Sequence, residues 1–335
     1  MGIKNLTSFL KDHCPNSIRQ INLNELNGKK AAIDVSIWLY RFKYKGNKLI
    51  PKFFEQINRL RINNITPIYI FDGPPGPEKN EVMSVRKTKK EEKFNKIDSL
   101  KNDLLKSDNV NKQIIQNQID ELNNKIISVS REDIKAVKQL FDFMNIKYIR
   151  AIGEADLLCS KLCTENIVDF VISEDMDLLT SGSKYLLRDF NIYNNKATLY
   201  DLDCILNTLN ITYDKFVELC ILFGCDYLKR ISGLGPKKSF KMIKEEVSIE
   251  SIIGIIKHKK IVHDNYIDEF KKSKDIFMTY DISYIDNSSL NIDITPITNE
   301  QQQHIINIIS KHSKLSYKQI INRLNNIYNV KELSK

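Results

Sequence analysis

The sequence predicts an α/β fold, in which a parallel twisted sheet is flanked by helices and followed by a helical region. Two short apolar runs, residues 30–35 and 66–71, have the length and bounding turn signals of buried strands. Between them, residues 51–64 carry apolar side chains at helical spacing, which makes a βαβ unit with parallel strands. Beyond Asp226 the apolar residues recur only at helical spacing.

Length and composition set the broad class of protein. A chain of 335 residues with 42% hydrophobic content can bury a core as one large domain or two closely packed ones. No apolar run reaches the roughly 18 residues of a membrane span, and no signal segment opens the chain, so we expect a soluble intracellular protein. Leu6 stands where a myristoylation signal needs Ser or Thr, so no lipid anchor is expected. The scattered cysteines predict free buried thiols.

The pattern changes after the βαβ unit and then resumes. Residues 78–127 are charged and contain no Gly or Pro, which indicates long exposed helices or a mobile insertion. Ser130 is followed three residues later by Asp133, a pattern that predicts the start of a helix. Strands and helices then alternate as in a doubly wound fold, with strands at 147–150, 168–172 and 185–188, and helices at 154–165 and after Asp201 and Thr212. Further helices are expected at 236–245, 249–258, 300–310 and 317–328.

Acidic residues stand where open α/β sheets gather ligand-binding groups, at the carboxyl ends of the strands. Each one alone is commonly a cap for backbone amides. Together they are expected to converge on one edge of the sheet, because a pair at i, i+2 in extended chain points to one side. The set comprises Asp34, Asp72, Glu154, Asp156, Asp175, Asp177 and Asp226.

So many carboxylates in one cleft would repel one another unless cations neutralised them. Oxygen ligands without nearby His or Cys favour Mg²⁺ or Mn²⁺ over zinc. Two such ions about 4 Å apart can activate water and stabilise a leaving oxygen, which is the chemistry of phosphodiester hydrolysis. None of the 5 His residues lies in these motifs, which argues against a histidine base.

The motifs resemble those of the flap endonuclease/XPG family, in the same order across nearly the whole chain. They are Met1-Gly2-Ile3, Ala32-Ile33-Asp34, Ile70-Phe71-Asp72-Gly73, Gly153-Glu154-Ala155-Asp156, Ser173-Glu174-Asp175-Met176-Asp177 and Phe223-Gly224-Cys225-Asp226-Tyr227. The resemblance implies a PIN-like 5′ nuclease fold and a structure-selective 5′ nuclease. It also implies that all seven carboxylates hold two Mg²⁺ ions, directly or through water. Mn²⁺ would be able to replace Mg²⁺. Asp156 departs from the pattern, because flap endonucleases usually carry Glu there and exonuclease relatives carry Asp.

The resemblance also implies a division of the chain. Residues 1–100 would form the N-terminal nuclease region with the start of the family's helical arch, and 101–130 the arch or linker insertion. Residues 131–225 would form the internal nuclease region. Residues 226–335 would form the helix-two-turn-helix DNA-binding region and the C-terminal helices.

A net charge of +9 indicates a polyanionic partner. When the residues after 78 are placed on a helix, one half of its circumference is basic and contains Lys79, Arg86, Lys89, Lys90, Lys93 and Lys96. The alternative interpretation is a solvated surface helix, because Lys-rich exposed helices are common. Lys79 and Arg86 match two basic arch residues of the family that meet the scissile phosphate, where they would stabilise charge in the transition state. Lys87, Lys89, Lys90 and Lys93 would steer the single strand.

Other DNA contacts are implied at Gly2, in the N-terminal motif, and at Tyr40. Tyr40 matches a family tyrosine that stacks on the base beside the cut, and core packing is the competing interpretation. Residues 231–238 form a glycine hairpin that leads into a helix, where Gly233, Gly235, Lys237 and Lys238 would grip a phosphate. A plain helix–helix turn is the alternative. In the family this element is the helix-two-turn-helix, which holds downstream duplex and often a K⁺ ion.

We therefore expect a monomeric 5′ flap endonuclease of replication and repair that binds branched DNA by shape. A 5′→3′ double-strand exonuclease of the same family is the close alternative, favoured by Asp156. A junction resolvase fits less well. A catalytically inactive DNA scaffold also fits less well, since every acidic position is filled. The chain lacks a QxxLxxFF-type tail, so recruitment by a sliding clamp is not expected. The expected compartment is the nucleus, or a cytoplasmic replication site if the protein is viral.

Overall fold

A seven-stranded mixed sheet forms the centre of the molecule, in the order β1-β7-β6-β5-β2-β3-β4. The computed structural model describes residues 2–44, 48–74, 76, 80–106, 109–124, 126, 128–245, 248–258, 262–285 and 295–328. The strands are β1 (Ile18–Asn22), β2 (Lys30–Asp34), β3 (Thr66–Phe71), β4 (Tyr148–Arg150), β5 (Phe170–Ile172), β6 (Tyr185–Asn191) and β7 (Lys196–Asp201).

The parallel βαβ prediction is confirmed, because β2 pairs in parallel with both β3 and β5. The expected sheet was incomplete, since β1 and β7 were not predicted and both pair antiparallel. β1 buries only Ile21 fully, so its sequence carries little of the alternation that marks a strand. The sheet is therefore mixed rather than wholly parallel, and the strands that end in acidic residues remain the parallel ones.

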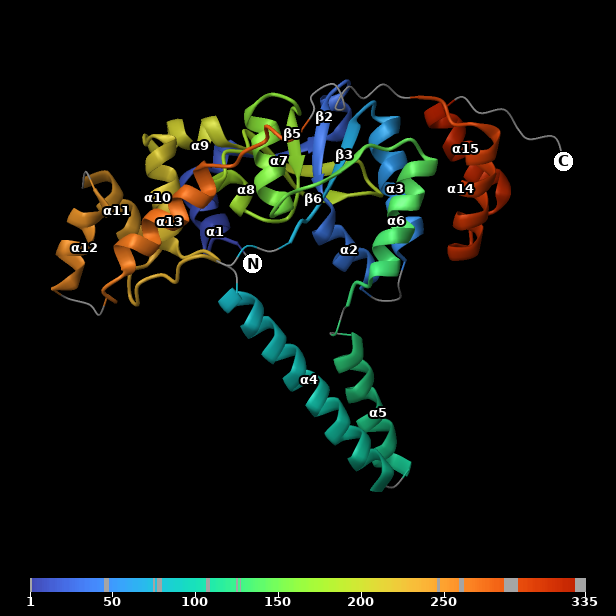
Figure 1. The fold of residues 1–335 in the computed structure, drawn as a ribbon, viewed down its shortest axis with the longest axis horizontal. Helices are drawn as coiled ribbons and strands as arrows, with labels where there is room; N and C mark the ends of the chain where they lie inside the picture. The colour runs from blue at the N-terminus through green and yellow to red at the C-terminus, as the bar shows by residue number, and fades with distance from the viewer. Residues whose placement is uncertain are drawn as a thin grey trace.

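Helices cover both faces of the sheet (Figure 1). Alternate strand residues point to opposite faces, so Ala32 packs in one core and its neighbours Ala31 and Ile33 pack in the other. The Ala32 core includes residues of α1 (Leu6–His13), α7 (Ala155–Thr164), α8 (Asp177–Thr180), α9 (Leu202–Leu209) and α10 (Tyr213–Phe223). The other core includes residues of α2 (Val35–Lys43), α3 (Leu49–Ile62), α6 (Arg131–Phe143), α14 (Asn299–His312) and α15 (Tyr317–Tyr328).

The helix start expected at Ser130 is confirmed. The Ser130 hydroxyl accepts the Asp133 N–H at 3.1 Å, and the Asp133 carboxylate accepts the Ser130 N–H at 2.7 Å. This reciprocal capping box satisfies two backbone donors at the start of α6. It fixes where the α/β fold resumes after the insertion.

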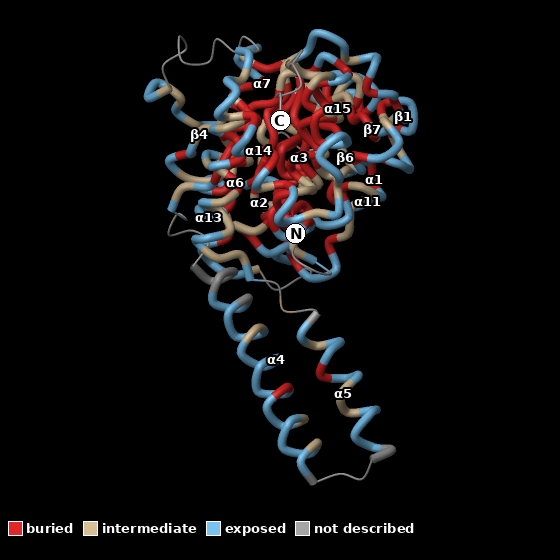
Figure 2. The backbone as a smooth tube through the Cα atoms, turned by 90° about the vertical axis from the view of Figure 1, so that its right-hand side faces the viewer, coloured by how far each residue is buried: buried red, intermediate tan, exposed pale blue. Residues whose placement is uncertain are grey.

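The insertion forms two long helices, α4 (Asn80–Lys106) and α5 (Asn109–Asn124), that project from the body as a hairpin, here called the arch (Figure 1). Among its described side chains only Ile97 and Ile119 are buried, and the rest of the hairpin is largely exposed (Figure 2). The prediction of long exposed helices is confirmed. The faces of α4 and α5 that point away from each other are therefore open to a ligand.

The region beyond Asp226 is helical in its described part, as predicted. It contains α11 (Pro236–Glu245), α12 (Ile249–Lys257) and α13 (Tyr266–Met278) at one end of the body, with α14 and α15 at the other (Figure 1). The sequence did not predict α13. Within the described residues, no helix combines the length and the apolar character needed to cross a membrane.

Candidate metal and nucleic-acid site

Asp34 ends β2 and caps the first turn of α2. Its carboxylate accepts the Ser36 N–H at 2.9 Å, and the residue is only 3% exposed. Burial, with the neighbouring Asp72 and Asp175 carboxylates adding, raises the pKa of Asp34 from 3.8 to about 7. A nearby cation would stabilise the ionised form of this carboxylate, because it offsets both the cost of burying the charge and the repulsion from the neighbouring carboxylates.

Asp72 lies beside Asp34 because β3 pairs in parallel with β2. Its carboxylate accepts the Ala155 N–H at 2.8 Å and also the Ser36 hydroxyl. The amide of Ala155 belongs to the first turn of α7, where orphan N–H groups favour an acid. Asp72 therefore joins the end of β3 to the start of α7.

Asp156 lies in that first turn of α7, at the centre of the acidic group. Burial, then Asp34, Asp175, Asp177 and Asp72, raise the pKa of its carboxyl well above the ordinary value. Its Oδ1 is buried and has no hydrogen-bond partner within the described residues. Such an oxygen is costly to bury unless a proton or a cation meets it.

Asp175 and Asp177 follow β5, the other parallel neighbour of β2. The Asp175 Oδ1 accepts the Asp177 N–H at 3.1 Å, which fixes the turn that brings both residues to the site. Gly2 lies against them at φ +86°, and a Cβ at Gly2 would stand 2.1 Å from the Asp175 Oδ1. The start of the chain therefore packs directly on the acidic group, a closeness that the sequence motif alone did not predict.

Glu154 and Asp226 stand at the rim of the group. The Tyr227 hydroxyl donates to the Glu154 Oε2 at 3.0 Å, which attaches the segment after α10 to the start of α7. Burial raises the pKa of the Cys225 thiol to about 12, with Asp177 and Asp226 adding to the rise, so these two acids flank one thiol. The structure thus brings five acids into one group, with Glu154 and Asp226 beside it. Asp34 and Asp177 are buried, Asp156 and Asp175 are half-buried, and Asp72 is exposed.

The donor set fits divalent cations. All its ligand atoms are carboxylate oxygens, which favour hard ions, and Asp156 offers a buried oxygen with no other partner in the described part. Among the described residues, no group of three His, Cys, Asp or Glu side chains is placed so that it could hold a metal ion by itself. A cation at this group would need water to complete its coordination shell.

Divalent metal is expected to stabilise the fold most at high pH. Without metal, the raised pKa of Asp34 and Asp156 means that the folded protein binds more protons than the unfolded chain, so stability falls as the pH rises from 3.8 to about 7. Bound Mg²⁺ removes this penalty. Melting temperatures with EDTA and with Mg²⁺ should therefore differ more at about pH 8 than at about pH 5. An equal difference at both pH values would contradict the assignment.

The residues expected to contact the strand near the cut are only partly described. Tyr40 is 50% exposed on α2, so core packing, the competing interpretation, is wrong. Lys90 lies with its Nζ 5.9 Å from the ring centroid of Phe94, and Lys93 is exposed. Lys79 lies outside the described residues, and Arg86 lies in α4 with its side chain outside them.

The glycine hairpin leads into α11 as expected, with Pro236 as the first helical residue. Gly233 adopts φ +71°, a conformation that favours glycine, and no atom lies within 4 Å of a Cβ built at Gly235. Lys237 and Lys238 are exposed beside them. A groove of about 640 Å³, here called the basic groove, runs between this loop and α1. Sequence reasoning missed its second wall, formed by Asn5, Ser8, Phe9, Asp12 and His13, and also the contribution of Arg230.

Comparisons with known proteins match both halves of the nuclease region. The family model for the XPG N-terminal domain matches residues 1–93, and that for the XPG I-region matches residues 145–226. Flap endonuclease 1 of Enterocytozoon bieneusi is 31% identical over 325 residues, which cover 88% of each chain. Flap endonuclease 1 of Theileria annulata is 30% identical over 307 residues, but this chain spans only 57% of that relative's length.

A solved structure shares the fold. The catalytic core of Rad2 in complex with DNA substrate has a TM-score of 0.68 at 21% identity, with 97% of this chain and 100% of that chain covered. The PIN-like 5′ nuclease fold expected from the motifs is therefore confirmed. With its family models, relatives and fold in agreement, the chain belongs to the flap endonuclease/XPG family, whose members are DNA nucleases that use divalent metal ions.

Proposed function

We propose that the protein is a structure-specific 5′ flap endonuclease that hydrolyses DNA phosphodiester bonds in replication and repair, with two Mg²⁺ ions at the acidic group. The observation that carries this proposal is the burial of Asp34 and of the Asp156 Oδ1 among further carboxylates, with no hydrogen-bond partner for that oxygen in the described part. Mn²⁺ would substitute for Mg²⁺.

The seven carboxylates would hold the ions, directly or through water. Bound metal would supply an activated water and stabilise the leaving oxygen. The chain itself supplies the positions: Asp72 is held by the Ala155 amide, Asp175 by its contact with the Asp177 amide, and Glu154 by the Tyr227 hydroxyl. Lys79 and Arg86 would face the scissile phosphate and stabilise its developing charge.

The basic groove would hold duplex DNA by its backbone. The glycine turn at Gly233 and Gly235, with the exposed Lys237 and Lys238, would bind a phosphate without reading bases, and a K⁺ ion at this turn would strengthen the contact. Gly2, Tyr40, Lys90 and Lys93 would contact the DNA near the cut. The residue divisions at 100, 130 and 225 stay as proposed boundaries between the nuclease halves, the arch and the DNA-binding region.

Replacing both Lys237 and Lys238 with alanine should weaken duplex binding equally for all sequences. Each lost phosphate contact lowers the slope of log affinity against log salt by about 0.9, so the slope should fall by about 2. Fluorescence anisotropy over a series of salt concentrations measures it. Lys241→Ala is the matched control, because Lys241 lies on α11 outside the groove lining and pairs with Glu245 at 3.7 Å. An unchanged slope in the double variant would remove the groove from the DNA interface.

The rival function is the 5′→3′ exonuclease, which Asp156 favours. A 5′-flap junction and a blunt duplex, each labelled at both ends of the cut strand, separate the two. The flap enzyme releases the flap as one oligonucleotide and leaves the blunt duplex largely intact. Preferential release of mononucleotides from the duplex would overturn the flap assignment and support the exonuclease. We propose that the enzyme acts as a monomer, in the nucleus as its eukaryotic relatives suggest, or at a viral replication site.

A further inference from the structure

The loop of residues 151–153 joins β4 to α7 and directly precedes Glu154, one of the seven acids. Carbonyl groups of this loop contact the segment that follows β3. The Gly73 N–H donates to the Gly153 carbonyl at 2.6 Å, and a Cβ built at Gly73 would stand 2.3 Å from the Ala151 carbonyl oxygen. The last two amides of the loop lie outside helix and strand, so they need partners of their own.

Two tyrosines that follow α13, Tyr280 and Tyr284, contact these amides and are here called the tyrosine pair. The Ile152 N–H donates to the Tyr284 hydroxyl at 3.4 Å, and the hydroxyl oxygens of the pair lie 3.3 Å apart. Burial raises the pKa of Tyr280, with the Tyr284 hydroxyl adding to the rise. The Gly153 and Ile152 amides counteract this rise, because they donate to the Tyr280 oxygen. Both amides that immediately precede Glu154 therefore meet a tyrosine hydroxyl.

The last turn of α13 reaches Glu154 by a second route, through its side chain. The Phe277 ring packs edge-on against the Tyr227 ring, with the centroids 5.3 Å apart. The Tyr227 hydroxyl in turn donates to the Glu154 Oε2 at 3.0 Å. Phe277 is buried in the core that contains residues of α10 and α13, so its ring is held firmly. Residues 277–284 thus contact the surroundings of Glu154 on both its backbone side and its side-chain side.

The contacts of the tyrosine pair orient the loop more than they satisfy its hydrogen bonds. Ile152 is 60% exposed, so water would reach its amide if Tyr284 were absent. A hydroxyl on an anchored ring differs from water because it holds the amide at one position. Metal ligands must be held to within roughly 0.5 Å of their working geometry. Loss of the outer contacts that orient such ligands typically weakens metal binding roughly 10- to 100-fold.

We propose that the tyrosine pair positions Glu154 for the divalent cation that this acid would bind. Tyr280 and Tyr284 are positioning residues, because they act through the backbone of residues 151–153 and not on the reacting atoms. Through them, and through Phe277, the end of α13 is joined to the acidic group. Loss of the two hydroxyls should weaken metal binding and leave the affinity for DNA unchanged. The proposal rests on the proposed function, because it takes the acidic group as the metal site.

The double variant Tyr280→Phe, Tyr284→Phe tests the proposal, because it removes both hydroxyls and keeps both rings. Electron paramagnetic resonance of free Mn²⁺ measures metal binding to the full-length protein without DNA. The double variant should bind Mn²⁺ about tenfold more weakly than wild type. Its single-turnover cleavage of a flap junction should need about tenfold more Mg²⁺ for half-maximal rate, with the rate at saturating Mg²⁺ nearly unchanged. Wild-type Mn²⁺ affinity in the double variant would overturn the proposal.

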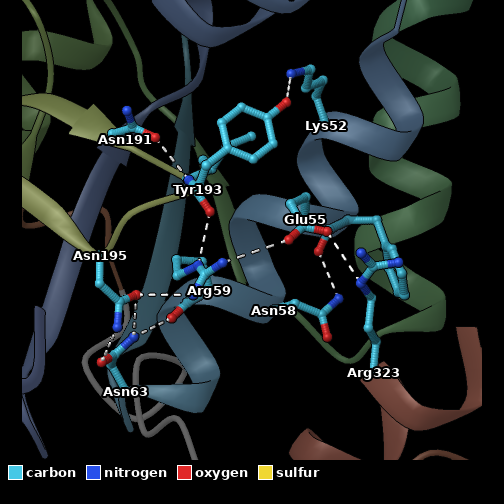
Figure 3. A network of polar contacts seen from close by, with 11 residues as sticks. Lys52, Glu55, Asn58, Arg59, Asn63, Asn191, Tyr193, Asn195 and Arg323 are labelled. Carbon is cyan, nitrogen blue, oxygen red and sulfur yellow. Dashed lines mark hydrogen bonds and ion pairs between the residues drawn. The ribbon is translucent and has the colours of Figure 1, made fainter. Parts of the chain in front are cut away.

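Tyr193→Phe is the matched control, because it also removes a tyrosine hydroxyl that makes a hydrogen bond. The Tyr193 hydroxyl accepts from the Lys52 ammonium, in a network that ties the β6–β7 turn to α3 (Figure 3). In the same network, Arg59 donates to the Ile192 carbonyl at 2.8 Å and to the Asn195 side chain at 3.2 Å (Figure 3). α3 packs in the core on the opposite face of the sheet from α7, so this variant should keep wild-type Mn²⁺ affinity. Equal losses in the control and in the double variant would refute the proposal.

A Glu154→Gln background separates the positioning of Glu154 from a general loosening of the fold. In that background the two Tyr→Phe changes should not weaken Mn²⁺ binding further, because the residue through which they act is already lost. A further tenfold loss there would contradict the proposal. Weaker junction binding by the double variant at wild-type Mn²⁺ affinity would place the tyrosine pair at the DNA and also overturn it. Wild-type protein that binds Mn²⁺ but cleaves no flap would instead refute the proposed function and leave the Mn²⁺ result standing.

Discussion

Asp175→Ala is expected to slow flap cleavage in Mg²⁺ by about 10³-fold, the scale on which loss of one electrostatic contact lowers the rate of an enzyme. Asp175 acts on the centre of the acidic group, because its charge raises the pKa of both Asp34 and Asp156 and its Oδ1 orders the turn to Asp177. Replacing Asp175 would remove one of the proposed metal ligands and loosen the turn that positions Asp177. Single-turnover rates at saturating enzyme and Mg²⁺ measure the effect on the chemical step.

Binding of the flap junction should survive this change, because the basic groove and the arch are untouched. Asp201→Ala is the matched control: Asp201 is the last residue of β7, and it caps α9 by accepting the Cys204 N–H at 3.0 Å. That variant should lose about 1 kcal/mol of stability and keep its cleavage rate. Wild-type cleavage by Asp175→Ala protein would show that the metal assignment is wrong.

Gly2→Ala is expected to lower the cleavage rate by about 10- to 100-fold, the range seen when a group that orients metal ligands is disturbed. The added Cβ would stand 2.1 Å from the Asp175 Oδ1, and a φ of +86° is itself unfavourable for alanine. Either Asp175 or the start of the chain must move. A higher Mg²⁺ concentration for half-maximal rate would accompany the loss, and both are read from single-turnover rates over a Mg²⁺ series.

Gly28→Ala isolates the steric part of this effect. Gly28 has a similar φ of +78°, but a Cβ there would meet no atom within 4 Å. Both variants share the backbone strain, whereas only Gly2→Ala collides with the acidic group. Equal losses in the two variants would show that Gly2 has no particular role at the site, and intact mass would verify that both proteins begin at the same residue.

The central strands and the acidic edge could be predicted from the sequence, because both depend on short-range patterns. β2 and β3 are apolar runs that each lead into an aspartate, and parallel neighbours must bring Asp34 and Asp72 to one edge. The capping box at Ser130 is likewise contained within four residues. The metal role of these residues stays a prediction, although their closeness is now described.

Other features depend on distant parts of the chain that no local pattern joins. β1 pairs with β7, which lies about 180 residues further along the chain. α1 forms one wall of the basic groove, and residues 230–238 form the other. The cavity between α2 and the start of α3 likewise needs the β6–β7 turn to complete its lining. Tyr193 is one tyrosine in a polar loop when read in sequence, and only its position beside Lys52 distinguishes it.

The strand order also has a consequence for synthesis of the chain on the ribosome. β2 lies between β3 and β5, so when residue 71 has emerged, one side of β2 still has no partner and about 100 more residues must be made before β5 appears. An open strand edge of this kind invites pairing with other chains. Nascent protein should therefore depend on chaperones until translation passes β5, and slow codons before that point should lower its yield.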